Sequence, residues 1–360
     1  MKQWSKKEFT RRLVRWNQEQ NDRAMPWKGE RDPYRIWLSE IILQQTRVQQ
    51  GWAYYQAFLR AFPDVRSLAS APDQAVFKLW EGLGYYTRCR NLIASARHIA
   101  FERDGRFPDT YAAIRALPGV GPYTAAAIAS FAFNLPHAVV DGNVQRVLAR
   151  VFGIREPADT ASGKRLFNQW AQDLLDPVRP GAYNQAIMDF GATVCKPLAP
   201  ACPTCPLRLH CVARRLDQVR ELPVKRKVSA PRRRWIYYLV LEHGDRVWIR
   251  QRGAGDIWQG LFEFLPVETD REVSAEEVLS LARVRGLLPK GAAETPVWSP
   301  RITQQLSHQQ ITGRFLRVRF SRKPAKPGPG QWVSRDQLIH FPFPVFIRSY
   351  LKSPGIATPA

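Results

Sequence analysis

The sequence has few acidic side chains for its length. Its 360 residues include 31 Asp and Glu against 54 Lys and Arg, which gives a formal net charge of +23. It also lacks an apolar run long enough to span a bilayer, and no basic amphipathic stretch stands out. These absences favour a polyanionic partner, and nucleic acid rather than a membrane. The alternative is that the excess charge only aids solubility.

A secretory leader is also missing. The first residues, MKQWSKKEFTRRLVRW, contain charges but neither an apolar core nor a small-residue cleavage site. We therefore expect a cytoplasmic protein, with cysteines kept in a reducing compartment.

Cysteine is scarce but concentrated, because four of the five cysteines lie in CKPLAPACPTCPLRLHC. In a reducing compartment this crowding predicts metal binding rather than disulfides. Four thiolates could hold zinc or an iron–sulfur cluster, and the single C-x2-C with short outer gaps favours the cluster. The fifth cysteine, Cys89, is expected in the core. The predicted ligands are Cys195, Cys202, Cys205 and Cys211.

The chain divides into two predicted domains. Apolar residues recur at three and four positions over residues 1–223, which predicts a mainly α domain. VKRKVSAPRRR, residues 224–234, is charged, contains Pro and reads as a linker. Residues 235–352 are predicted to form a small α+β domain. In it, WIYYLVLEHGDRVWIRQR predicts a hairpin of two strands joined by a His-Gly-Asp turn, and GRFLRVRFSR predicts another strand. EEVLSLARVRG predicts a helix.

A Pro-Gly turn leads directly into an alanine-rich helix in LPGVGPYTAAAIASFAF. Because such a turn leaves unpaired N–H groups at the start of the helix, it can bind a phosphate without side-chain charge. It would then follow a DNA backbone whatever the base sequence. An ordinary connection between helices is the alternative, and the net charge favours the phosphate. The predicted backbone-binding residues are Pro118, Gly119, Val120 and Gly121.

Two acidic residues have different predicted surroundings. Glu40 lies in PYRIWLSEIILQQ, a helical segment that is apolar nearly all round, so its pKa should be raised, as suits a general acid. The alternative is a solvated Glu, or one paired with Arg47. Asp141 precedes GNVQRVLARVF and can cap that helix, whose N-terminus is expected to lower its pKa. Such a pair suits protonation of a leaving group and stabilisation of an oxocarbenium ion.

The turn, the downstream Asp141 and the cysteine spacing together resemble the helix–hairpin–helix DNA glycosylases with a [4Fe–4S] cluster, over most of residues 10–215. This superfamily includes endonuclease III and the adenine DNA glycosylases. The resemblance implies a domain with a six-helix lobe and an iron–sulfur lobe, DNA in the cleft, and a target nucleotide flipped out of the duplex. It also implies a bacterial protein associated with the nucleoid.

The absence of a lysine after the turn indicates which branch of this superfamily the chain resembles. Endonuclease III-like enzymes have a Schiff-base lysine after the turn, where this chain has Pro122, Tyr123 and Thr124. PWKGERDPYRIWLSEIILQQTRV and NQAIMDFGATVC instead resemble the adenine glycosylase branch. The catalytic residues that this resemblance implies are Glu40 as the acid, Asp141 as the stabiliser of the sugar cation, and Tyr123 and Asn143 as residues that orient these acids and the water.

The same resemblance implies residues that bind the substrate. Gln45 and Tyr85 resemble residues that enter the base stack, and Arg23, Trp27 and Gln185 resemble the lining of an adenine pocket. The expected activity is monofunctional hydrolysis of the N-glycosidic bond of adenine opposite 8-oxoguanine or guanine in duplex DNA. We expect the protein to act as a monomer.

The second domain resembles the Nudix-like module that recognises 8-oxoguanine in adenine glycosylases. Its candidate metal-binding stretch, GLFEFLPVETDREVSAEEVLSLARVRG, has the acidic residues in the wrong frame, so we expect no hydrolase activity. In LSHQQITGRF, Ser307 and His308 resemble the family's lesion-sensing pair. Leu306 replaces the usual Phe, which leaves Ser307 to hydrogen-bond the lesion.

Two other interpretations remain open. One is an endonuclease III-like pyrimidine glycosylase and lyase. The other is a non-catalytic iron–sulfur DNA-binding protein, which would account for the charge, the turn and the cysteines. It would leave Glu40 within its apolar helix unexplained.

Overall fold

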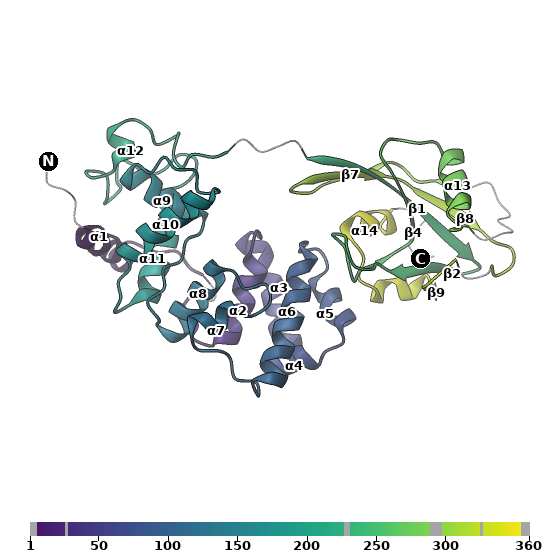
Figure 1. Cartoon of the computed structure of the whole chain (residues 1–360), viewed down its shortest axis with the longest axis horizontal. Coiled ribbons are helices and arrows are strands. Elements are labelled where there is room, and N and C mark those ends of the chain that lie inside the picture. The colour runs from purple at the N-terminus through teal and green to yellow at the C-terminus, as the bar shows by residue number, and fades with distance from the viewer. Residues whose placement is uncertain (1–5, 26–27, 227–230, 289–296, 325–326, 354–360) are drawn as a thin grey trace. The chain divides into compact units, whose positions relative to one another are not determined.

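The computed structural model forms two compact units, drawn in Figure 1. The first comprises Met1–Ser70 with Asn91–Lys227, and the second comprises Ala71–Arg90 with Val228–Ala360. The predicted domain boundaries at residues 223 and 235 stay predictions. The residues that the structure describes are 6–25, 28–226, 231–288, 297–324 and 327–353.

Helices build the first unit, as the apolar spacing predicts, and its described residues contain no strand. Within the described ranges, no helix is both long and apolar enough to cross a lipid bilayer. The helices are α1 (Lys6–Glu19), α2 (Pro33–Leu43), α3 (Val48–Ala61), α4 (Val65–Ser70), α6 (Tyr86–Arg97, which begins in the second unit), the π-helix η1 (His98–Glu102), α7 (Tyr111–Arg115), α8 (Pro122–Phe133), α9 (Gly142–Phe152), α10 (Ala161–Leu174), α11 (Pro180–Thr193) and α12 (Val212–Arg215).

Local capping sets the start of α2. The side chain of Asp32 accepts hydrogen bonds from the backbone N–H groups of Tyr34 and Arg35, and Pro33 occupies the first helical position. Proline is favoured there because that N–H has no partner within the helix. The helix ends before Gln45, whose φ of 56° is left-handed. The next helix, α3, begins at Val48.

The core of the first unit lies around α9 and α11. These two helices pack on each other, and α1 packs on α11, where the Trp16 and Phe190 rings meet edge-on with centroids 5.0 Å apart. A separate contact joins α2 to α8. The packing therefore brings the helix of Glu40 against the helix that follows the Pro-Gly turn.

A mixed sheet with nine strands among the described residues builds the second unit. The long strand β1 pairs antiparallel with β2 and β4 and parallel with β7 and β8. The strands lie together with α13 and α14 in Figure 1. The elements are β1 (Arg232–His243), β2 (Arg246–Gln251), β3 (Phe262–Glu263), β4 (Leu265–Thr269), β5 (Val297–Trp298), β6 (Ile302–Gln305), β7 (Gln309–Gly313), β8 (Phe315–Arg319), β9 (Gln331–Ser334), the helices α5 (Asp73–Trp80), α13 (Ala275–Val284) and α14 (Val345–Leu351), and the 3-10 helix η2 (Asp336–His340).

The predicted hairpin, strand and helix of this unit are confirmed as β1–β2, β8 and α13. β1 begins at Arg232, inside the segment predicted as a linker, whose bounds stay a prediction. The backbone of residues 232–234 pairs in parallel with β7, and the Arg234 guanidinium is buried between Asp256 and Glu268, at 2.9 and 2.6 Å. The charge of this segment suggested a linker. The carboxylates of Asp256 and Glu268 pair with the Arg234 guanidinium and so allow it to be buried in a strand.

Candidate active site

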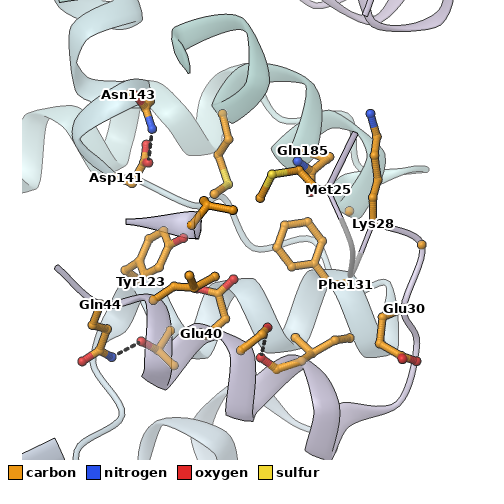
Figure 2. A pocket seen from close by; sticks show the side chains of 18 of the residues that line it. Met25, Lys28, Glu30, Glu40, Gln44, Tyr123, Phe131, Asp141, Asn143 and Gln185 are labelled. Carbon is orange, nitrogen blue, oxygen red and sulfur yellow. Dashed lines mark hydrogen bonds between the residues drawn. The ribbon is translucent and has the colours of Figure 1, made fainter. Parts of the chain in front are cut away.

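One cavity of about 960 Å³ in the first unit collects many of the predicted site residues. They come from the segments on either side of α2, from α2 itself, from the Pro-Gly turn with α8, from α9 with its N-cap, and from α11. Figure 2 shows part of this lining. Trp27 lies outside the described residues. The predicted residues that line the cavity are Arg23, Glu40, Gln45, Gly119, Gly121, Tyr123, Asp141, Asn143 and Gln185.

Glu40 is buried on α2, with 9 % of its surface exposed. The pKa of this carboxyl is raised to about 7. Burial is the largest cause, a hydrogen bond with Tyr123 opposes it, and the negative charge of Asp141 adds to it. The Tyr123 hydroxyl points toward the Glu40 carboxyl in Figure 2. Burial and a raised pKa are therefore confirmed for Glu40, whose side-chain partner is a tyrosine rather than an arginine.

Asp141 caps α9, as predicted. Its Oδ1 accepts a hydrogen bond from the backbone N–H of Val144 at 2.8 Å, and its Oδ2 accepts one from the Asn143 amide at 2.7 Å. The predicted lowering of its pKa is wrong. Burial raises the pKa of Asp141, and this effect outweighs the opposite effects of Val144, Asn143 and Arg146. Both carboxyls in the cavity therefore hold a proton more readily than they would in water.

The end of the Asn143 amide that does not contact Asp141 is held by Arg146, a residue that was not predicted. Arg146 donates from Nη2 to the Asn143 Oδ1 and to the carbonyl of Gly191, each at 2.7 Å, and from Nε to the carbonyl of Cys195 at 2.7 Å. A Cβ at Gly191 would lie 2.7 Å from the Cβ of Asn143, so a glycine is needed for this approach. The i,i+3 spacing of Asn143 and Arg146 could have indicated the pair.

The four clustered cysteines line one small cavity of about 20 Å³, and all four are free of disulfides. Burial raises the pKa of Cys195, of Cys211 and of Cys205, the last to about 12. Within the described residues, no three His, Cys, Asp or Glu side chains are grouped as ligands of a metal ion. Four thiols around one cavity are a donor set that fits zinc or an iron–sulfur cluster, and the cluster stays a prediction.

The Pro-Gly turn leads into α8 as predicted, and it follows α7. Gly119 has a left-handed φ of 74°, and a Cβ there would lie 2.6 Å from the Cβ of Asn91. The Ser95 hydroxyl donates to the carbonyl of Pro118 at 2.9 Å, which anchors the turn on α6. Gly121 provides no side-chain cap for α8. The first N–H groups of α8 are thus available to an outside acceptor, and phosphate binding stays a prediction.

In the second unit, Ser307 and His308 lie exposed in the turn between β6 and β7. A hydrogen bond of 2.8 Å from the Leu306 N–H to the Gln309 carbonyl closes this turn. The Tyr85 and Ser307 hydroxyls are hydrogen-bonded to each other. Tyr85 is 45 % exposed and has a left-handed φ of 48°. The motifs indicated these two residues separately, and the structure brings them together.

Comparisons with known proteins agree with this arrangement. Residues 38–172 match the HhH-GPD superfamily of base excision DNA repair proteins, and residues 236–353 match the NUDIX domain. An adenine DNA glycosylase of Buchnera aphidicola is 33 % identical over 261 residues, which are 71 % of this chain and 73 % of that protein. The human adenine DNA glycosylase is 44 % identical over 221 residues, which are 58 % of this chain and 40 % of that protein.

Among solved structures, a thermostable thymine-DNA glycosylase is similar, with a TM-score of 0.54 and 29 % identity. The match covers 59 % of this chain and 97 % of that one. The superfamily match includes Glu40, the Pro-Gly turn and Asp141, and the similarity to the Buchnera protein extends over most of both chains. The chain therefore belongs to the adenine DNA glycosylase family, within the HhH-GPD superfamily of base excision DNA repair proteins.

Proposed function

We propose that this protein is a monofunctional DNA glycosylase that releases adenine paired with 8-oxoguanine or guanine in duplex DNA. The observation that supports this most directly is the pair of carboxyls with raised pKa values, the buried Glu40 and the half-buried Asp141, on one cavity with Tyr123. The relatives named adenine DNA glycosylase support adenine as the base.

In this mechanism Glu40 is the general acid. A carboxyl with a pKa of about 7 is about half protonated at neutral pH and can readily give up its proton. It protonates N7 of the flipped adenine, so that the base leaves as a neutral molecule when the C1′–N9 bond breaks. Tyr123 holds the Glu40 carboxyl in place through its hydroxyl.

Asp141 acts on the sugar. Its two oxygens are fixed by Val144 and Asn143, so the carboxylate has a set position when positive charge develops at C1′. A carboxylate there stabilises the oxocarbenium ion or captures it until a water oxygen bonds to C1′. Asn143 is itself fixed by Arg146, which makes the position of the pair depend on the packing of α9 against α11.

DNA binding rests on the turn and on two inserting side chains. The uncapped N-terminus of α8 with Pro118–Gly121 would hold a backbone phosphate. Gln45 and Tyr85 would enter the duplex stack. Both have left-handed backbone conformations, which cost non-glycine residues free energy and often mark functional positions.

The turn at Ser307 and His308 would read 8-oxoguanine. Ser307 is exposed and shares a hydrogen bond with the Tyr85 hydroxyl, so one polar group and one aromatic ring meet at the point where the lesion would lie. We expect Ser307→Ala to lose preference for adenine opposite 8-oxoguanine over adenine opposite guanine. An unchanged preference would count against lesion sensing at this turn.

The four cysteines would hold a [4Fe–4S] cluster. Arg150 donates to the carbonyl of Lys196 at 2.7 Å and to the Cys195 sulfur at 3.6 Å, so an arginine supports the loop next to the first ligand. The cluster would tie the loop of residues 195–211 together. Equal amounts of iron and acid-labile sulfide in the purified protein, both lost in Cys205→Ser, would agree with this assignment.

The decisive experiment uses a duplex with one adenine opposite 8-oxoguanine, incubated with protein and then treated with alkali. Strand cleavage that appears only after alkali shows release of the base without lyase activity. Glu40→Gln should bind the duplex and release no adenine. Release near the wild-type rate would remove Glu40 as the acid, and no release by the wild-type protein would refute the proposed activity.

A lyase remains the second candidate because of Lys28. This lysine lines the cavity, with its Nζ 3.4 Å from Asp189, although no lysine follows the turn. Borohydride trapping separates the two functions. Efficient crosslinking to DNA that is lost in Lys28→Ala would favour the lyase, whereas a trace adduct with adenine released in full would favour the hydrolase.

A further inference from the structure

Asp189 is a buried carboxylate that the proposed mechanism does not use. It lies on α11 with 0 % of its surface exposed, behind one wall of the cavity. Its oxygens accept hydrogen bonds from the side chains of four residues. These donors are Arg23 Nη1 at 2.7 Å, Asn21 Nδ2 at 2.8 Å, Gln185 Nε2 at 2.9 Å and Lys28 Nζ at 3.4 Å.

Three of these four donors, Arg23, Lys28 and Gln185, line the cavity. Gln185 and Lys28 lie near Met25 in Figure 2, away from Tyr123 and Asn143. All four groups are donors, so the carboxyl of Asp189 acts only as an acceptor. It is therefore a shared anchor for one wall of the cavity, on the side away from the catalytic pair.

This anchor sets which way the Gln185 amide points. Gln185 precedes Asp189 by one helical turn, so the two side chains meet on the same face of α11. A carboxylate oxygen can bond only to the Nε2 end of the amide, which assigns the amide orientation by chemistry. The carbonyl oxygen Oε1 is then the end of the amide that does not bond to Asp189, and it can accept from a group in the cavity that Gln185 lines.

We propose that Asp189 is a positioning residue that determines which base is accepted, by turning the Gln185 carbonyl toward it. The inference rests on the proposed adenine site. Adenine presents an amino group at C6, which donates to a carbonyl oxygen. Hypoxanthine presents a carbonyl oxygen at C6, and two acceptors facing each other in a closed site repel each other and lose their hydrogen bonds to water. Both bases have the N7 that Glu40 would protonate, so the comparison isolates the group at C6.

The test compares release of adenine and of hypoxanthine, each opposite 8-oxoguanine, by the ratio of their kcat/KM values. In Asp189→Asn the introduced amide keeps the volume of the carboxylate but offers one acceptor oxygen in place of two, so the Gln185 amide is no longer held in one orientation. We expect the preference for adenine over hypoxanthine to fall at least about tenfold. A general loss of stability or activity would slow both bases alike and leave the ratio unchanged.

A double-mutant cycle shows whether Asp189 acts through Gln185. Gln185→Ala should lower the same ratio, and Asp189→Asn in the Gln185→Ala background should lower it no further. Multiplied effects, or an unchanged ratio in folded Asp189→Asn, would overturn the proposal. Glu242→Gln is the matched control, because Glu242 is a buried carboxylate held by three arginines in the sheet of the second unit. It should reduce stability and leave the ratio intact.

A measurement on the unaltered protein covers the case in which Asp189→Asn does not fold. The side-chain NH2 signal of Gln185, assigned by its loss in Gln185→Ala, should be protected from exchange with solvent. Rapid exchange would overturn the proposal. A wild-type protein that releases no adenine would refute the proposed function itself, whereas adenine release with an intact ratio in the variant refutes only the role of Asp189.

Discussion

The buried carboxyl of Glu40 predicts a pH-dependent difference in stability between the wild-type protein and Glu40→Gln. Burial raises the pKa of Glu40 from 4.5 to about 7, so between these pH values the folded protein holds a proton that the unfolded chain releases. The protonated carboxyl thus contributes stability that is fully present below pH 4.5 and is lost as the pH rises to about 7. Glutamine does not ionise and loses nothing over this range.

The size of the difference follows from the two pKa values. The interval between 4.5 and about 7 corresponds to about 3 kcal/mol, at about 1.4 kcal/mol for each pH unit. Glu40 is nearly fully buried, so solvent screening reduces this value little. We therefore expect Glu40→Gln to gain about 3 kcal/mol over the wild-type protein above pH 7, relative to their difference below pH 4.5.

Urea unfolding of both proteins at several pH values measures this gain. The helical circular dichroism signal is the suitable probe, because helices form the unit that contains Glu40. Groups that do not interact with Glu40 titrate alike in both proteins and cancel in the difference. A difference that stays constant across this pH range, or that favours the wild-type protein as the pH rises, would refute a raised pKa at Glu40.

Three further predictions concern the same site. Single-turnover release of adenine should fall about tenfold per pH unit above about 7, as Glu40 loses its proton, and a flat profile would argue against a general acid there. Asp141→Asn keeps a residue that caps α9 well, so the melting temperature should change little while turnover is lost; the reverse result would leave Asp141 as a cap alone. Gly119→Ala would place a methyl group 2.6 Å from Asn91 at a φ of 74°, so chemical unfolding should show a loss of about 1–3 kcal/mol and titration should show weaker binding of undamaged duplex. Normal stability and binding would contradict a role for the turn.

Local patterns in the sequence determined much of the fold and part of the site. The apolar residues on every side of Glu40 indicated a buried carboxyl because helical periodicity places them there. Asp141 before an amphipathic segment indicated a cap, and His-Gly-Asp between two apolar runs indicated a hairpin. Each of these features depends on residues within one or two turns of helix or strand.

Tertiary structure alone decided the features that depend on distant partners. β1 reaches back to Arg232 because β7 pairs with it, and the pKa of Asp141 is raised because surrounding elements exclude water from it. Tyr85 hydrogen-bonds to Ser307 only once the chain is folded. In the same way, Asp189 accepts hydrogen bonds from residues of the segment before α2 only in the folded chain. Burial and hydrogen bonding are set by atoms that approach in space, so periodicity and spacing along the chain do not predict them.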